Sequence, residues 1–332
     1  MSSQLNDIKN TITFIIPTKN RVKYIKDFFL KNKFLNKINC KFLIIDGSKK
    51  QDFLYKKKII PINNKTRIKK QKKKGFMNAC FETIKYIDTN YFTFLYDDDI
   101  LSDQIIHVYK KCFDKNFAIG LGQVSNKKNI VFKKSFFKRV SKDRVIDAYY
   151  GNKFSNVKFL PVSPICSIFE RNILEKWKSY IINYCKNNKY RKYFLLKKNI
   201  GPDLLLYLMQ IRNKNRIYIY QKPVAVFYSH KDSMSVIFGR NELLIGYWLV
   251  KKLFFQNNNL SYEINKKMYN FIILMGFFLI VYNFLLFLVM KKSYVRFIVT
   301  EVIHLKKNTT MEMSIKYLIK IIFNKLCNLF VR

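Results

Sequence analysis

Three adjacent carboxylates follow an apolar run in the first third of the chain. Asp97, Asp98 and Asp99 come directly after residues 92–96. Acids are scarce in this sequence, with 21 Asp and Glu against 63 Lys and Arg, so three in a row indicate a specific role. Like charges at this spacing repel one another, and a cation or hydrogen-bond donors must offset the repulsion. The cluster therefore predicts a divalent-metal site; the alternative is an acidic turn that caps the next helix through Ser102 or Asp103.

Further polar motifs also stand just after, or just before, apolar runs. They are Pro17-Thr18-Lys19-Asn20-Arg21, Asp46-Gly47-Ser48, Gly201-Pro202-Asp203 and the polar segment around His230. In open α/β sheets, ligands bind outside the carboxyl ends of the strands. If the apolar runs before the first two motifs and the acid triplet are parallel strands, their polar residues gather at one edge of a sheet.

The segments that must position these residues alternate between strand-like and helix-like patterns over residues 11–235. The patterns predict strands at 13–17, 41–46, 91–96, 118–124, 162–169 and 224–228, and helices at 22–32, 76–86, 104–113 and 203–211. Such alternation is typical of βαβ units and of a mainly parallel sheet. The basic run 65–74 is predicted to be a solvated loop, with a phosphate-attracting rim as the alternative.

In this order and spacing, the motifs resemble those of the inverting family 2 glycosyltransferases. The resemblance covers roughly residues 11–235 and rests on Ile-Pro-Thr-x-Asn-Arg, Asp-Gly-Ser, the acid triplet and the later aspartate. It implies a GT-A-type, Rossmann-like, mainly parallel sheet flanked by helices, and a transferase that uses a nucleotide-sugar donor with Mg²⁺ or Mn²⁺. Tyr96 stands where many members have an aspartate, and Pro202 where many have a glutamate.

The resemblance also implies a role for each motif. It assigns the nucleotide-sugar pocket to Pro17, Thr18, Asn20, Arg21, Asp46, Asp97 and Asp98, the metal to Asp98, Asp99 and His230, and the general base to Asp203. A cation neutralises the charge of a leaving diphosphate, and a carboxylate takes the proton of an attacking hydroxyl. Which two of the three adjacent acids bind the metal stays open. The structural alternatives are a turn cap for Asp46, a helix N-terminal acid for Asp203 and an ordinary histidine at 230.

The formal charge of +42 favours anionic partners. A nucleic-acid-binding protein is one alternative, but the basic residues are scattered and no nucleic-acid module is recognisable, so we expect no nucleic-acid partner. A nucleotidyltransferase is another, although the turn at 18–21 lacks the glycines of its usual phosphate loop. We expect a glycan or lipid-linked acceptor in surface polysaccharide synthesis. Six cysteines without a Cys-x-x-Cys pair favour a reducing cytoplasm.

The C-terminal part of the chain differs in character. Residues 268–290 contain no charge and are long enough to cross a bilayer, but 291–332 carry nine Lys or Arg against two Glu, which disfavours translocation of this tail. Residues 315–330 place their apolar side chains on one helical face. We therefore predict a glycosyltransferase domain at 11–238 and a helical, membrane-associated extension at 239–332, on the inner face of the membrane.

Overall fold

The computed structural model describes residues 11–48, 66–113, 116–125, 132–150, 160–228, 240–258, 269–276, 278–279, 297 and 300–301. The chain divides into two compact units, Met1–Met268 and Tyr269–Arg332. In the second unit, the longest described segment is a helix over 269–276. Within the described residues, no helix combines the length and the apolar character needed to span a bilayer. The predicted amphipathic segment 315–330 and most of 268–290 lie outside the described residues.

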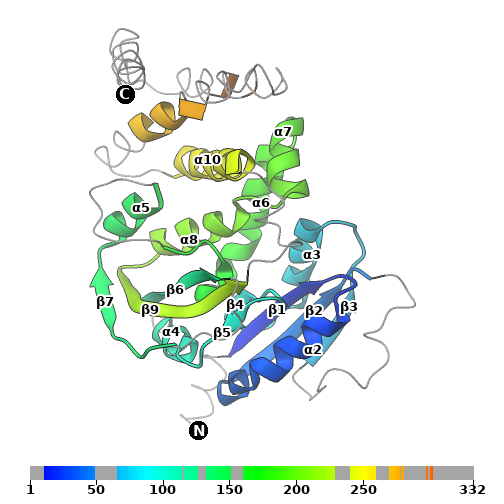
Figure 1. Ribbon diagram of the computed structural model, residues 1–332. Helices are drawn as coiled ribbons and strands as arrows, with labels where there is room; N and C mark the ends of the chain where they lie inside the picture. Colours follow the sequence, from blue (N-terminus) through cyan, green and yellow to red (C-terminus); the bar gives the residue numbers. More distant parts are fainter. Residues whose placement is uncertain are drawn as a thin grey trace. The chain divides into compact units, whose positions relative to one another are not determined.

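A five-stranded sheet in the order β3-β2-β1-β4-β8 carries the first part of the chain (Figure 1). Its strands are β1 (Ile12–Thr18), β2 (Cys40–Asp46), β3 (Thr66–Lys70), β4 (Tyr91–Phe94) and β8 (Phe169–Glu170). The first four run parallel, whereas the two-residue β8 pairs with β4 in the antiparallel direction. Thr18 pairs with Asp46 and Ile15 with Phe94, so the carboxyl ends of β2, β1 and β4 meet at one edge.

A second, mixed sheet has the order β5-β9-β6, with β7 also paired to β9. Its strands are β5 (Ile100–Leu101), β6 (Asn116–Ser125), β7 (Phe137–Val140) and β9 (Arg216–Tyr228). β6 runs parallel to β9, and β5 and β7 run antiparallel to it. Because β5 begins directly after Asp99, β4 and β5 anchor the two ends of the segment that carries the acid triplet.

Helices cover both sides of the first sheet; Figure 1 shows α2 and α3 on opposite sides. The longer helices are α2 (Val22–Lys31), α3 (Phe76–Thr83), α4 (Ile105–Lys111), α5 (Lys142–Tyr150), α6 (Leu174–Cys185), α8 (Pro202–Arg212) and α10 (Arg240–Gln256). Shorter turns are α7 (Lys189–Arg191), the π-helix η5 (Lys192–Lys197) and the 3-10 helices η1 (Lys33–Lys37), η2 (Ile84–Tyr86), η3 (Pro164–Cys166) and η4 (Arg171–Ile173).

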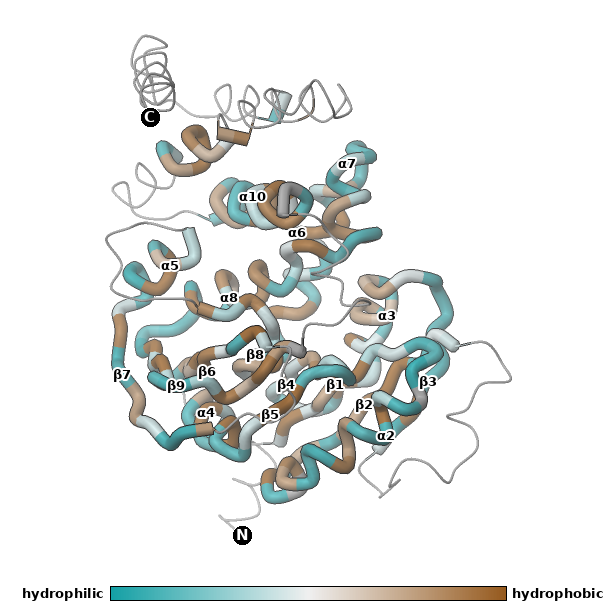
Figure 2. The backbone as a smooth tube through the Cα atoms, viewed as in Figure 1, coloured by the Kyte–Doolittle hydropathy of each residue, from teal (hydrophilic) through white to brown (hydrophobic). Residues whose placement is uncertain are grey.

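Aromatic side chains join these layers. Phe29 of α2 packs on Phe42 of β2 with ring centroids 5.1 Å apart, and Trp177 of α6 packs on Phe81 of α3 at 5.3 Å and on Phe94 of β4 at 6.0 Å. In α8, every residue from 204 to 211 is buried. A helix that is apolar all round belongs in the interior, so α8 is a rigid mount for the residue at its start. In Figure 2, much of the tube along β1 and β2 is brown, the colour of hydrophobic residues.

The predicted mainly parallel sheet flanked by helices is confirmed. Two local predictions were wrong. Residues 162–169 are not a strand, because Pro161 and Pro164 have no N–H to donate to a ladder, and η3 with the short β8 forms instead. The basic run at 65–74 is not wholly a loop, because Thr66–Lys70 pairs with β2 as the edge strand β3. The predicted domain boundary at 238 stays a prediction.

Candidate active site

The turns after β1 and β2 are held together by hydrogen bonds. Gly47 N donates to Thr18 O at 2.8 Å, and Asn20 N donates to Ser48 Oγ at 2.7 Å. Asn20 has a φ of +55°, in the left-handed region that asparagine tolerates better than most residues. The buried Asp46 accepts a hydrogen bond from Ser48 N at 2.8 Å through Oδ1. Asp46 therefore caps its own turn, which is the structural alternative given for this residue. Its role in binding a nucleotide stays a prediction.

Arg21 joins the β1 turn to the acid triplet. Its Nη1 lies 2.7 Å from Asp97 Oδ1, and its Nη2 lies 3.0 Å from Asp98 Oδ2. Its guanidinium also lies over the ring of Tyr24, 4.2 Å from the centroid. Thr18 Oγ1 donates to the other oxygen of Asp97 at 3.0 Å. The two turns thus form one ion-paired unit at the sheet edge, and both oxygens of Asp97 are occupied.

The acids of this unit are crowded and poorly solvated. Burial raises the pKa of Asp97 to about 6, although Arg21 opposes this shift. Burial and the two neighbouring carboxylates raise the pKa of Asp99 well above its usual range. Asp99 is 8% exposed, and its Oδ2 has no hydrogen-bond partner. A buried polar atom without a partner is costly, and a hard divalent cation would offset that cost.

Two of the three predicted metal ligands lie among the described residues. Asp98 and Asp99 lie side by side in the turn after β4, whereas His230 lies outside the described residues. Within the described residues, no three His, Cys, Asp or Glu side chains are grouped as a metal site. The oxygen donors and the unpartnered Asp99 Oδ2 nevertheless fit Mg²⁺ or Mn²⁺, which prefer carboxylates. The metal assignment stays a prediction.

Asp203 lies at the start of α8, beside the acid turn. Gly201 precedes it with a φ of +103°, which reverses the chain into the helix. The half-buried Asp203 accepts a hydrogen bond from Tyr96 OH to Oδ2 at 2.9 Å. Burial raises the pKa of Asp203 to about 7, and the Tyr96 hydrogen bond acts in the opposite direction. The structure therefore links the predicted base to the acid turn through the side chain of Tyr96.

Helices α3 and α10 border Asp203. Burial raises the pKa of Cys80 in α3 and of Tyr247 in α10, and the charge of Asp203 adds to both shifts, which places the carboxylate near both side chains. Gln71, in the basic run, is a residue that the sequence reasoning missed. Its N–H donates to Asp46 O at 2.8 Å and its Nε2 to Gly75 O at 2.7 Å. It thus fixes the loop that leads into α3, and no motif signals it.

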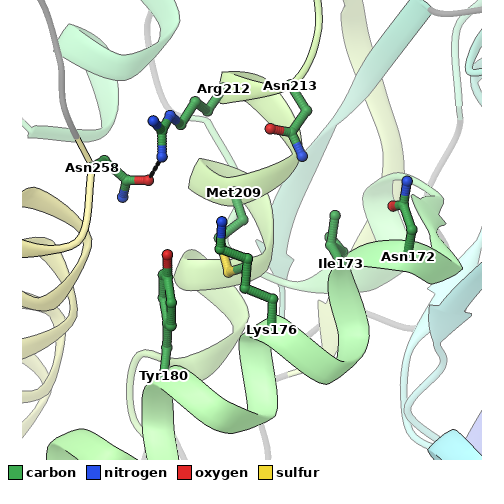
Figure 3. Close-up of a pocket in the computed structure, with 8 residues that line it drawn as sticks. All are labelled: Asn172, Ile173, Lys176, Tyr180, Met209, Arg212, Asn213 and Asn258. Carbon is green, nitrogen blue, oxygen red and sulfur yellow. Dashed lines mark hydrogen bonds between the residues drawn. The ribbon is translucent and has the colours of Figure 1, made fainter.

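A separate pocket lies between α6 and the carboxyl end of α8 (Figure 3). It is lined by Asn172, Ile173, Lys176, Tyr180, Met209, Arg212, Asn213 and Asn258. Arg212 Nη1 donates to Asn258 Oδ1 across its upper side. The lining contains no carboxylate and none of the predicted site residues. The candidate active site is therefore the sheet edge that carries Arg21 and the acid triplet, together with Asp203 at the start of α8.

Some solved structures of other proteins have a fold similar to that of this chain. No protein-family model and no curated protein matches this sequence. Among solved structures, S. aureus TarS (residues 1–349) in complex with UDP-GlcNAc is 16% identical, with 80% of this chain and 71% of that chain covered at a TM-score of 0.50. The mannosyltransferase PcManGT from Pyrobaculum calidifontis, in complex with GDP-Man and Mn²⁺, is 12% identical over 81% and 71%, at a TM-score of 0.48. The chain thus shares the fold of TarS, a protein whose structure holds a nucleotide sugar.

Proposed function

We propose that the protein is a metal-dependent, inverting glycosyltransferase. It moves a sugar from a nucleotide-sugar donor to a hydroxyl of a glycan or lipid-linked acceptor in surface polysaccharide synthesis. The observation that carries the proposal is the link between two acidic groups: the triplet, in which Arg21 pairs with Asp97 and Asp98, and Asp203 at the start of α8, which Tyr96 contacts. The fold shared with TarS, which binds UDP-GlcNAc, supports a nucleotide-sugar donor.

The donor side is built from the turns after β1, β2 and β4. Pro17, Thr18, Asn20 and Arg21 would line the nucleotide pocket together with Asp46. Arg21 and Thr18 keep Asp97 in place, and Asp98 and Asp99 would hold the divalent cation. When bound, Mg²⁺ or Mn²⁺ supplies positive charge against the leaving diphosphate. His230 remains the predicted third ligand.

The acceptor side is built on α8. Asp203 takes the proton of the acceptor hydroxyl, the oxygen forms a bond to the anomeric carbon, and the bond from that carbon to the diphosphate breaks. Attack from the face opposite the diphosphate inverts the anomeric centre. A base works best when its pKa lies near the working pH, and burial raises the pKa of Asp203 to about 7.

Replacing the base tests this assignment. In Asp203→Asn, transfer should be lost while the Kd for the donor, measured by isothermal titration, stays close to that of the wild type. Asp88→Asn is the matched control, because Asp88 pairs only at the surface with Lys41 at 2.9 Å and Arg67 at 3.5 Å. Full transfer by Asp203→Asn would refute the base assignment.

The donor class can be found by a thermal-shift screen of UDP-, GDP- and CDP-sugars, with and without Mn²⁺. We expect one class to raise Tm, and to do so more when Mn²⁺ is present. Release of pyrophosphate in place of a nucleoside diphosphate would favour the alternative, a nucleotidyltransferase. We also propose that the protein acts at the inner face of the membrane, supported by the apolar face of 315–330 and the charge of +42. Co-flotation with anionic vesicles, and its absence with neutral ones, tests that.

A further inference from the structure

The residue just before the acid triplet contacts the proposed base. Tyr96 lies two residues past the end of β4, and its hydroxyl donates to Asp203 Oδ2 at 2.9 Å, although 107 positions separate the two in sequence. The next residue, Asp97, is the one that Arg21 and Thr18 clamp. Two consecutive residues therefore contact the two halves of the site, one facing the donor turns and the other facing α8.

Three contacts hold Tyr96 itself. Its ring packs against Phe76 at the start of α3, with centroids 5.9 Å apart. Its carbonyl oxygen accepts a hydrogen bond from Asp99 N at 3.3 Å, which closes the turn around the triplet. Its hydroxyl reaches Asp203. A tyrosine has two χ angles between backbone and ring, so a packed ring delivers its hydroxyl to a well-defined position.

The residue type suits this position. An aspartate here would add a fourth carboxylate to the cluster and would repel Asp203. A tyrosine hydroxyl instead donates a charge-assisted hydrogen bond to the ionised carboxylate. Such a bond stabilises the charged form of Asp203 and so lowers its pKa, whereas burial raises it. Because the bond is made to Oδ2 alone, it also fixes the orientation of the carboxylate.

We propose that Tyr96 is a positioning residue for Asp203, holding Oδ2 so that Oδ1 is left for the acceptor hydroxyl. It also ties the geometry of the base to that of the acid turn. This inference rests on the proposed function of Asp203 as the general base. Tyr96 itself touches neither donor nor acceptor in this role and transfers no proton.

Tyr96→Phe is the test, because it keeps the ring and removes only the hydroxyl. The matched control is Tyr193→Phe, which removes a hydroxyl that donates to another carboxylate, Glu242 Oε1, at 3.1 Å. In Tyr96→Phe, kcat should fall about 10- to 100-fold, the range expected for a lost hydrogen bond to a charged group. The acid limb of the kcat profile, near pH 7 in the wild type, should move to higher pH, and the donor Kd should stay within about twofold. Tyr193→Phe should change none of the three.

Two results for Tyr96→Phe would overturn the inference. In the first, neither kcat nor the pH of the acid limb of its profile changes. In the second, kcat falls and the donor binds more weakly, but the acid limb stays at the same pH. The second pattern would mean that Tyr96 only supports the acid turn. If Tyr96→Phe does not fold, Tyr96→His, which keeps a ring and a donor, should fold and retain more activity than Tyr96→Ala.

A further measurement separates this inference from the proposed function. The carboxyl pKa of Asp203, followed by carbon-13 NMR, should be higher in Tyr96→Phe than in the wild type whether or not sugar transfer is ever found. An unchanged Asp203 pKa would refute the contact. Absence of transfer in the wild type, with the pKa shift present, would refute the glycosyltransferase assignment and leave the contact standing.

Discussion

Replacing Gly201 by alanine should destabilise the protein and disturb the base. Gly201 immediately precedes α8 and has a φ of +103°, and α10 crosses it closely. A Cβ at this position would lie 2.7 Å from Val250 Cγ2 and 2.8 Å from the backbone oxygen of Gly246. The positive φ costs an alanine about 1–2 kcal/mol, and forced overpacking adds about 1–3 kcal/mol. The free energy of unfolding should therefore fall by about 2–5 kcal/mol.

Two other glycines separate the two costs. Gly75 also has a positive φ, +109°, but a Cβ there would meet only Asn78 Nδ2, at 3.6 Å. Gly246→Ala has the opposite balance, because its Cβ would lie 2.3 Å from Ile200 Cγ2 and 2.6 Å from Ile200 Cβ without a positive φ, while alanine improves helix propensity by about 1 kcal/mol. Gly201→Ala carries both costs and should therefore be less stable than Gly75→Ala, which carries only the first.

Thermal unfolding provides the assay. A domain of this size loses about 2–4 °C of Tm per kcal/mol, so Gly201→Ala should melt at least about 4 °C below the wild type. It should also lose transfer activity, since relief of the clash shifts the start of α8 and with it Asp203. The reasoning fails if Gly201→Ala melts at or above Gly75→Ala, because the close crossing of α8 and α10 would then impose no cost.

Three further predictions concern the acids. Wild-type kcat should fall as the pH drops below about 7 and a proton occupies Asp203; a pH–rate profile that is flat down to pH 5.5 would contradict this. The raised folded-state pKa of Asp203 means that its stabilising contribution is present below its unfolded pKa and lost as the pH rises through about 7. Asp203→Asn should therefore raise Tm at pH 8 but leave it nearly unchanged at pH 4. Asp99→Asn should weaken Mn²⁺ binding at least about tenfold by calorimetry, whereas the exposed Asp143→Asn should not.

The elements that position the site could be predicted because their patterns are strong. β1, β2 and β4 are covered on both faces by helices, so each reads as a continuous apolar run that ends in a polar turn. α8 is buried on all sides and reads as an unbroken apolar stretch. Their predicted bounds differ from the observed ones by only one or two residues. The order of the motifs along parallel strands was then enough to predict that the polar turns share an edge.

Weaker patterns hid other elements. β3 is an edge strand whose side chains point largely to solvent, so its Lys-rich composition resembles that of a loop. α6 buries Leu174, Trp177, Ile181 and Cys185, but lysines and tyrosines between them blur the helical period. The individual contacts were beyond prediction, because neither strand order nor side-chain direction is written in a hydrophobic pattern. Arg21 meets two acids 76 and 77 positions away only because β4 lies next to β1.

Positive φ angles in the described part of the chain gather around the candidate site, independently of any resemblance. Four described residues have positive φ: Asn20 in the β1 turn, Gly75 at the start of α3, and Asn199 and Gly201 before α8. All four lie on the elements that border the acid cluster. Glycine adopts positive φ freely, whereas the two asparagines do so at a cost, and non-glycine residues held in this region concentrate at functional sites.

The buried carboxylates also single out the candidate site. Burial raises the pKa of Asp97 to about 6 and of Asp203 to about 7, so ionised carboxylates at this edge weaken the fold at neutral pH. Asp99 adds a buried oxygen without a partner. Replacing these acids by amides would relieve the cost, and a fold selected for stability alone would have no reason to keep them. Their presence together, beside turns with positive φ, supports the proposed chemistry, which needs both a cation site and a base.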